Sequence, residues 1–278
     1  MLILVAGCGY IGLEAARSFH ALGWEVTGLT ATAESARRLE SEPFRVVACD
    51  INDRESLAAL SPRGAPFDAV LDCVSSGRGG ADDYRRVYLE GARSLIETLH
   101  PARFLFTSST SVYAQTDGGT VTEESPATPD RETGRILKAT EELVLAHGGQ
   151  IARLAGIYGP GRWALLSSFL EGRAVIEGDG SRVINQIHRD DAVAALVLLL
   201  TQPAAPGIFN VADDEPMAQA EAFRAFAEFY QRPLPPAGPV DLSRKRGWTS
   251  KRVSNAKLRA LGWSPRYPSL REALITAR

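Results

Sequence analysis

The first residues of the chain that could do chemistry are three glycines. Gly7, Gly9 and Gly12 form a Gly-x-Gly-x-x-Gly pattern. An apolar run, Leu2–Ala6, precedes it, and a helix-forming run, Leu13–Arg17, follows it. Gly7 permits a tight turn, Gly9 leaves the backbone open to a pyrophosphate, and Gly12 lets a helix pack closely on a strand. The pattern predicts a dinucleotide site at a helix N-terminus, with a turn that binds no ligand as the alternative.

The end of the next predicted strand bears on the choice of cofactor. The strand covers Glu25–Leu29 and ends at Thr30, roughly 20 positions after the glycines, where dinucleotide folds commonly place an acid for the ribose hydroxyls. Thr30 and Thr32 could instead donate to a 2′-phosphate, and Arg37 or Arg38 could reach it. We therefore expect NADP, with NAD as the less favoured cofactor. A solvated threonine loop beside two surface arginines is the other interpretation.

Later strands end in further candidate cofactor residues. Asp50 and Ile51 close the run that begins at Phe44, where an adenine edge would lie; alternatively, Asp50 belongs to the N-cap region of a helix that begins near Asp53. The complete predicted cofactor site also takes in residues between the glycines and at two further strand ends. It comprises Gly7, Gly9, Tyr10, Ile11, Gly12, Thr30, Thr32, Arg37, Asp50, Ile51, Val74, Ser75, Thr107 and Lys138.

The elements that must position these residues alternate between strand and helix. Helical patterns cover about 82–99 and 132–146, and a sixth strand covers 150–154. Such alternation predicts an α/β fold, a Rossmann-type doubly wound parallel sheet with a small interleaved C-terminal α/β lobe. We expect a dinucleotide-binding domain over 1–155, with contributions from about 183–212, and a smaller substrate-binding lobe over 156–278.

Composition narrows the classes of partner. The chain has 278 residues, 45% of them hydrophobic, and a formal net charge of -2, which gives no general attraction to nucleic acid or to an anionic membrane. Its apolar runs are shorter than a membrane span, and a strand is predicted directly after Met1, where a signal peptide would carry a charged region. We expect a cytoplasmic protein that binds neither nucleic acid nor membrane.

The cysteines and histidines predict no metal chemistry. Cys8, Cys49 and Cys73 lie in or beside apolar strands, where a reduced thiol acts as a small hydrophobe. The four histidines are scattered. His188 lies close to Asp190 and Asp191, but Asp191 begins an apolar helix, so we expect a capping role rather than a metal site.

Ordered landmarks along nearly the whole chain resemble the extended short-chain dehydrogenases/reductases, in particular the sugar-nucleotide epimerases and dehydratases. These landmarks are Gly7–Gly12, Asp50–Ile51, Thr107–Ser109, Val112–Tyr113, Arg153, Gly156–Gly161, Ile187–His188 with Asp191, Phe209–Val211, Lys257–Leu258 and Leu261–Trp263.

The resemblance implies a catalytic Ser, Tyr and Lys, with Tyr and Lys four positions apart on one helix. Ser109 matches the Ser and Lys138 the Lys, which also binds the nicotinamide ribose, but the Tyr position is Gly134. The chain is thus identified as an atypical member that lacks this proton donor. Tyr113 is the first candidate to replace it, ahead of Thr133 and Tyr158, with a Tyr113 packed at the base of its loop as the alternative.

The resemblance further implies hydride transfer between the cofactor and a carbonyl or alcohol. The substrate would be a small molecule, a sugar or a nucleotide-sugar, and the reaction an epimerisation, dehydration or reduction. Gly134 supports an alternative, a catalytically silent NADP-binding protein that acts as a redox sensor or scaffold. By analogy with such folds, a homodimer is also an expectation.

Overall fold

The structure is a computed structural model that describes residues 1–61, 64–77, 79–202, 206–242 and 248–276. It divides into two compact units. The first comprises Met1–Ser109, Glu132–Arg153 and Val193–Phe209, and the second Thr110–Arg131, Leu154–Ala192 and Asn210–Arg278. Each unit therefore takes three separate segments of the chain.

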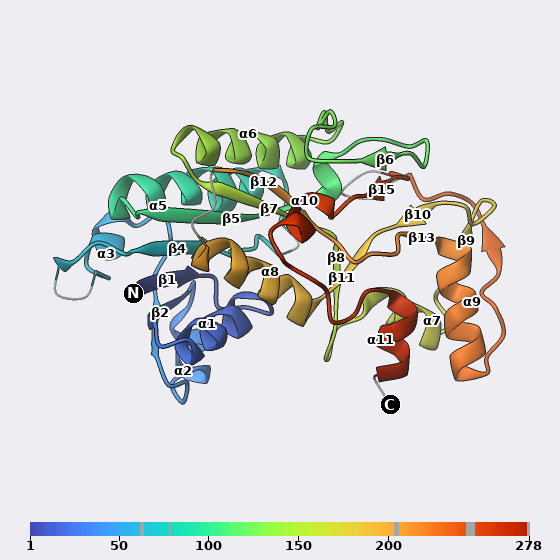
Figure 1. Ribbon diagram of the computed structural model, residues 1–278, viewed down its shortest axis with the longest axis horizontal. Coiled ribbons are helices and arrows are strands. Elements are labelled where there is room, and N and C mark those ends of the chain that lie inside the picture. The colour runs from blue at the N-terminus through green and yellow to red at the C-terminus, as the bar shows by residue number, and fades with distance from the viewer. Residues whose placement is uncertain (62–63, 78, 203–205, 243–247, 277–278) are drawn as a thin grey trace. The chain divides into compact units, whose positions relative to one another are not determined.

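A seven-stranded sheet forms the centre of the first unit (Figure 1). Its strands, in the order β12-β7-β5-β4-β1-β2-β3, are β12 (Gly207–Val211), β7 (Gln150–Leu154), β5 (Arg103–Ser109), β4 (Ala69–Asp72), β1 (Leu2–Ala6), β2 (Glu25–Thr30) and β3 (Arg45–Ala48). β1 pairs in parallel with both β2 and β4, and the β2–β3 and β4–β5 pairs are parallel as well. The predicted doubly wound parallel sheet is confirmed.

Helices cover both faces of this sheet. They are α1 (Gly12–Ala21), α2 (Ala33–Arg38), α3 (Arg54–Ala58), α4 (Ala81–Tyr84), α5 (Gly91–Leu99), α6 (Glu132–Ala146) and α8 (Arg189–Thr201). α1 lies on one side of the sheet, and α5 and α6 lie on the other (Figure 1). Ile3, Leu4 and Val5 of β1 are fully buried, which explains the uninterrupted apolar run at the start of the chain.

The helix predicted over 82–99 is present but not uniform. α4 and α5 are joined by η2 (Arg85–Glu90), a π-helical segment of six residues. Tyr84 and Tyr88 are buried on its inner side with ring centroids 4.9 Å apart, whereas Arg86 is exposed. A π-helical segment inside an α-helix is a feature that apolar periodicity does not reveal.

Within its described residues, the second unit is built from short strand pairs and four α-helices. The paired strands are β8 (Gly156–Tyr158) with β11 (Gln186–His188), β10 (Val183–Ile184) with β13 (Met217–Ala218), β9 (Ile176–Glu177) with β14 (Ala237–Gly238), and β6 (Thr120–Val121) with β15 (Arg252–Val253). The helices are α7 (Ala164–Leu170), α9 (Gln219–Tyr230), α10 (Ala256–Ala260) and α11 (Leu270–Thr276). Phe169, Phe223, Phe226, Leu270 and Leu274 belong to its hydrophobic core.

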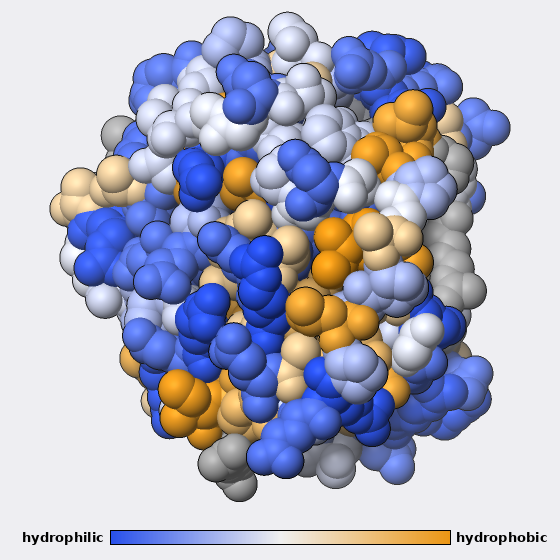
Figure 2. Space-filling view, turned by 90° about the vertical axis from the view of Figure 1, so that its right-hand side faces the viewer, coloured by the Kyte–Doolittle hydropathy of each residue, from blue (hydrophilic) through white to orange (hydrophobic). Residues whose placement is uncertain are grey.

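Hydrophobic and hydrophilic side chains are mixed on the surface of the molecule. On the face in Figure 2, hydrophobic residues are interspersed among hydrophilic ones. The exposed large hydrophobic residues of the second unit include Val175, Leu234, Val240 and Leu242. Among the helices of the described residues, none is long and apolar enough to cross a membrane.

Candidate cofactor and active site

The glycine turn has the geometry that its spacing predicts. Gly7 has a φ of +92°, and a Cβ at this position would lie 2.8 Å from the backbone of Cys73. A Cβ on Gly12 would lie 2.1 Å from the carbonyl oxygen of Gly7. The turn therefore requires glycine at both positions, for conformation at the first and for close packing of α1 at the second.

Gly9 has a different role from its two neighbours in the motif. A Cβ at Gly9 would meet no described atom within 4 Å, so the space above its backbone is open. α1 begins at Gly12, and its N-cap residue Ile11 makes no side-chain hydrogen bond to the first turn. An open backbone beside a helix N-terminus without a side-chain cap suits an anionic group such as a pyrophosphate.

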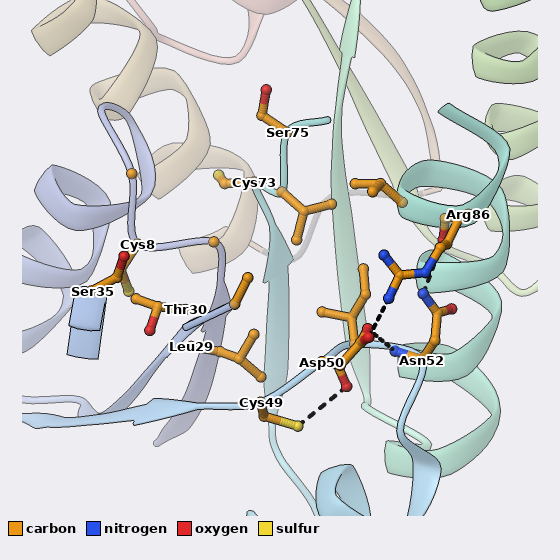
Figure 3. Close-up of a pocket in the computed structure, with 16 residues that line it drawn as sticks. Cys8, Leu29, Thr30, Ser35, Cys49, Asp50, Asn52, Cys73, Ser75 and Arg86 are labelled. Atoms are coloured by element: carbon orange, nitrogen blue, oxygen red, sulfur yellow. Dashed lines mark hydrogen bonds and ion pairs between the residues drawn. The ribbon is translucent and has the colours of Figure 1, made fainter. Parts of the chain in front are cut away.

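A cavity of about 540 Å³ adjoins this turn (Figure 3). It lies at the carboxyl ends of β1, β2, β3 and β4, the edge of a parallel sheet where such folds bind their ligands. Its described lining residues are Gly7, Cys8, Gly9, Leu29, Thr30, Ala31, Ser35, Cys49, Asp50, Ile51, Asn52, Cys73, Val74, Ser75, Arg86 and Val87. Open space at Gly9 and a cavity of this size fit a dinucleotide.

The cavity brings together half of the predicted cofactor residues. Those that line it are Gly7, Gly9, Thr30, Asp50, Ile51, Val74 and Ser75. Those outside its described lining are Tyr10, Ile11, Gly12, Thr32, Arg37, Thr107 and Lys138. Sequence reasoning missed Ala31, Ser35 and Asn52, which are close neighbours of predicted residues. It also missed Arg86, which no motif marks.

On the side of the cavity away from the end of β2, Asp50 contacts both Asn52 and Arg86. Its Oδ1 accepts a hydrogen bond from the backbone N–H of Asn52 at 3.0 Å, and its Oδ2 forms an ion pair with Arg86. Figure 3 shows these three residues together on one side. The N-cap of α3 is Asp53, whose carboxylate accepts from the backbone N–H of Ser56 at 3.2 Å. The cap interpretation of Asp50 is thus wrong, because Asp53 fills that role.

The opposite side is formed by the end of β2. Thr30 is buried, and its hydroxyl lies 3.2 Å from the carbonyl oxygen of Thr32 and 3.4 Å from that of Val47. Thr32 caps α2, since its hydroxyl oxygen accepts from the backbone N–H of Ser35 at 3.2 Å. Both hydroxyls expected to donate to a 2′-phosphate are therefore already hydrogen-bonded within the chain.

The two arginines of α2 are exposed. Arg38 forms an ion pair with Glu34 one turn earlier on the same helix. Neither Arg37 nor Arg38 belongs to the described lining of the cavity. A contact with a 2′-phosphate would thus require these long side chains to extend toward the rim.

All three cysteines line the cavity as free thiols. Burial raises the pKa of Cys8 to about 11 and the pKa of Cys73 well above its usual value. Burial also raises the pKa of Cys49. Thiols in such surroundings stay protonated at neutral pH and are poor nucleophiles.

The predicted catalytic residues of the first unit lie on β5 and α6. Ser109 is the last residue of β5, and Thr107 on the same strand donates to the carbonyl oxygen of Asp72 at 3.0 Å. Lys138 lies on α6, where its Nζ is 3.2 Å from Glu142 Oε1. Gly134 is buried one turn before Lys138 on the same helix. No side chain projects from this position toward Lys138, whose partner is an acid on the next turn.

A buried network joins α6 to the sheet. Glu141 on α6 accepts from the hydroxyl of Ser108 at 2.7 Å and from Nε and Nη2 of Arg153 at 2.9 and 2.6 Å. Ser108 precedes Ser109 on β5, and Arg153 lies on β7. Arg153 is one of the sequence landmarks, whereas Glu141 is not, because an acid within a helix gives no sign in the sequence of being buried.

Tyr113 has the surroundings of a packed residue. Its side chain is fully buried, and its hydroxyl lies 2.9 Å from both the carbonyl oxygen of Thr122 and Oδ1 of Asn210. A phenol has one proton to donate, and both acceptors here belong to the protein. The environment matches the alternative that the sequence left open, a Tyr113 packed at the base of its loop.

Tyr158 and Asp191 have structural contacts as well. Tyr158 is buried against Trp163, with stacked ring centroids 4.5 Å apart, and burial raises its pKa. Asp191 accepts from the backbone N–H groups of Arg266 and Tyr267 at 2.7 and 2.9 Å. Within the described ranges, no group of three or more His, Cys, Asp or Glu side chains could hold a metal ion.

Comparisons with known proteins identify the family of the chain. The model of the NAD dependent epimerase/dehydratase family matches residues 3–212. Protein YeeZ of Escherichia coli K12 is 33% identical over 225 residues, which cover 75% of this chain and 76% of its own. The 3-diazoavenalumate denitrifying reductase of a Streptomyces species is 30% identical over 307 aligned positions, which cover 99% of each chain.

Solved structures show the same fold. An NAD-dependent epimerase/dehydratase structure from Methylobacillus flagellatus superimposes with a TM-score of 0.79 at 29% identity, over 99% of this chain and 97% of the other. A dTDP-glucose 4,6-dehydratase from Streptomyces venezuelae, solved with bound NAD, reaches 0.81 at 21% identity, over 99% and 95% of the two chains. The chain belongs to the NAD dependent epimerase/dehydratase family.

Proposed function

We propose that this protein is an oxidoreductase that binds a nicotinamide dinucleotide in the 540 Å³ cavity and acts on a carbonyl or alcohol. The cavity carries the proposal, because it joins the glycine turn to Asp50 along the carboxyl edge of the sheet. A structural turn alone would need glycine at Gly7 and Gly12 for its geometry, but it would not need the open space at Gly9.

The chain's own residues have separate roles toward this cofactor. The backbone at Gly9 and the N-terminus of α1 would hold the pyrophosphate, and Asp50 would accept from the adenine amine. Lys138 would hold the nicotinamide ribose, as the family resemblance implies. When bound, the cofactor supplies a hydride donor or acceptor.

We propose NADP ahead of NAD. The described lining at the end of β2 consists of Leu29, Thr30, Ala31 and Ser35, which include no acid to repel a 2′-phosphate. Arg37 on the following helix adds positive charge, whereas the charge of Arg38 is paired with Glu34. The hydroxyls of Thr30 and Thr32 no longer support the choice, since both are engaged within the chain.

At the reacting centre, the proposed site has no assigned side chain for proton transfer. Ser109 would hold the substrate oxygen, and Lys138 would supply a cation. Gly134 has no side chain that could transfer a proton, and the hydroxyl of Tyr113 is bonded to Thr122 and Asn210. We propose that the proton of the substrate hydroxyl passes through water or through a group of the substrate itself.

The substrate that we propose is a small molecule, a sugar or a nucleotide-sugar by family resemblance. The Streptomyces relative, whose alignment covers 99% of both chains, is named as a reductase. This similarity favours reduction over epimerisation or dehydration for the chain described here. Cytoplasmic location and a homodimer stay part of the proposal.

A second candidate is a protein that binds the dinucleotide without turnover, as a redox sensor or scaffold. Gly134 favours this second candidate, because glycine has no side chain at the position where the family resemblance places the proton donor. The two candidates differ in one measurement. An oxidoreductase consumes NADPH when a carbonyl substrate is supplied, whereas a silent sensor binds NADPH and does not oxidise it.

The experiment that tests cofactor binding replaces Gly9. A side chain at this position meets no described atom, so Gly9→Ala and Gly9→Val should fold normally while they fill the space proposed for the pyrophosphate. Calorimetric titration with NADPH and NADH should show tight binding to the native protein, weaker binding to Gly9→Ala, and little to Gly9→Val. Equal affinities in all three proteins would refute the proposed site.

A further inference from the structure

We infer that Arg86 is a cofactor-binding residue: its guanidinium forms, with Asp50, the wall on which the adenine ring of the bound dinucleotide lies. The inference rests on the proposed function, because it concerns the same cavity. It adds a residue that lies 36 positions after Asp50 in the chain, outside every motif of the sequence.

The backbone near Arg86 is held against the loop after β3. Arg86 lies in the π-helical segment η2, and Asn52 Nδ2 donates to its carbonyl oxygen at 3.1 Å. A Cβ on Gly91 would lie 2.1 Å from Cδ1 of Ile51, so glycine there permits the close approach of helix and loop. These two contacts hold Arg86 beside the strand end that carries Asp50.

The side chain of Arg86 then reaches the cavity. Its guanidinium forms an ion pair with Oδ2 of Asp50, and Figure 3 shows it directed toward Asp50 on the side of the cavity opposite Thr30 and Ser35. Arg86 and Asp50 are 57% and 46% exposed. Ion pairs with this exposure contribute little to folding, so substitution of Arg86 tests binding rather than stability.

The pair offers what an adenine ring requires. A guanidinium is planar and stacks on aromatic faces, and a carboxylate accepts from an exocyclic amine. The ion pair also fixes the carboxylate of Asp50 at the cavity rim before the ligand binds. Since NAD and NADP share the adenine ring, Arg86 should contribute equally to both, whereas Arg37 and Arg38 would act only on the 2′-phosphate.

The test compares four ligands by calorimetry. In Arg86→Ala, the Kd values for NADH, NADPH and ADP-ribose should each rise about tenfold, a size typical of a lost cation–π contact. The Kd for reduced nicotinamide mononucleotide, which has no adenine, should not change. Arg86→Lys should lose most of the same affinity, because an ammonium keeps the charge but not the planar face.

Arg85 gives a matched control. It is the adjacent arginine, 50% exposed, and it lies 3.8 Å from Glu132 rather than in the described lining. Arg85→Ala should bind all four ligands as the native protein does. Native affinity in Arg86→Ala or Arg86→Lys, or a loss confined to NADPH, would overturn the inference and leave the proposed function standing. Failure of the native protein to bind any dinucleotide would overturn both.

Discussion

Glu141 and Arg153 form a buried, bidentate ion pair, with Nε and Nη2 of the arginine 2.9 and 2.6 Å from the two carboxylate oxygens. Their side chains are 0% and 1% exposed. The hydroxyl of Ser108 completes the network at 2.7 Å from Oε1. Through this carboxylate, α6 with Lys138 is fixed to β5 with Ser109, so a charge outside the cavity sets the relative position of two proposed catalytic residues.

We expect Glu141→Gln to destabilise the protein strongly. Loss of the carboxylate leaves Arg153 buried without a counter-charge, which costs about 3–5 kcal/mol. Chemical denaturation followed by circular dichroism measures this cost. Glu142→Gln is the matched control, because Glu142 is exposed and its pair with Lys138 contributes only about 0–1 kcal/mol. Equal stability of the two variants would contradict a structural role for the buried pair.

Tyr113→Phe should lower stability and leave turnover unchanged. The substitution removes the hydroxyl that lies between Thr122 and Asn210, so the buried acceptor that its one proton serves loses its donor, at a cost of about 1–3 kcal/mol. Thermal unfolding measures this loss, and NADPH oxidation per folded molecule measures turnover. A variant with native stability that no longer oxidises NADPH would restore Tyr113 as the proton donor.

The sequence predicts the regular parts of the first unit well. α6 covers Glu132–Ala146 and β7 covers Gln150–Leu154, as the periodicity indicates, because long elements with one buried face repeat their apolar residues. The strand pairs of the second unit are only two or three residues long in the described chain, which is too short for any period to show. Their register depends on tertiary contacts.

In the candidate site too, the residues set by local sequence could be predicted and those set by tertiary packing could not. The glycine turn is local, so spacing alone predicts that Gly7 and Gly12 cannot carry a side chain. Arg86 reaches the cavity through a π-helical segment and the close approach of Gly91 to Ile51, and both depend on packing between distant parts of the chain. Asp50 and Asp53 differ by three positions, and only the structure shows which of them caps α3.

Asp72 should make stability depend on pH. Its carboxyl is fully buried at the end of β4, and burial raises its pKa from 3.8 to about 7. A pKa that is higher in the folded state gives stability that is present below pH 3.8 and lost as the pH rises toward 7. This group alone would lower the free energy of unfolding by up to about 4 kcal/mol between these limits.

Asp72→Asn isolates that contribution. The amide does not titrate, so the difference in unfolding free energy between native protein and variant should change between about pH 4 and 7 and level off above it. Burial also raises the pKa of Glu123 and Asp213, but these groups are present in both proteins and cancel in the difference. Urea denaturation at a series of pH values measures it, and a difference independent of pH would show that Asp72 ionises freely.

Gly134→Tyr should supply a proton donor at the position where the family resemblance expects a tyrosine. Position 134 lies one turn before Lys138 on α6, so a tyrosine there would share a face with the lysine. General acid catalysis by a positioned side chain contributes about 10²–10⁴-fold. We therefore expect the variant to oxidise NADPH at least tenfold faster than the native protein with a panel of small aldehydes and ketones.

Gly134→Phe is the control that separates the effect of the tyrosine hydroxyl on turnover from the effect of its aromatic ring. Both variants remove a helix-interior glycine and add a large side chain at a buried position, so they should share any change in stability. Only the tyrosine can transfer a proton, and its rate should fall as the pH rises through the pKa of the new phenol. A gain of equal size in both variants would mean that the ring improves substrate packing. No gain in a folded, NADPH-binding Gly134→Tyr would contradict the prediction and show that a donor at this position does not limit turnover.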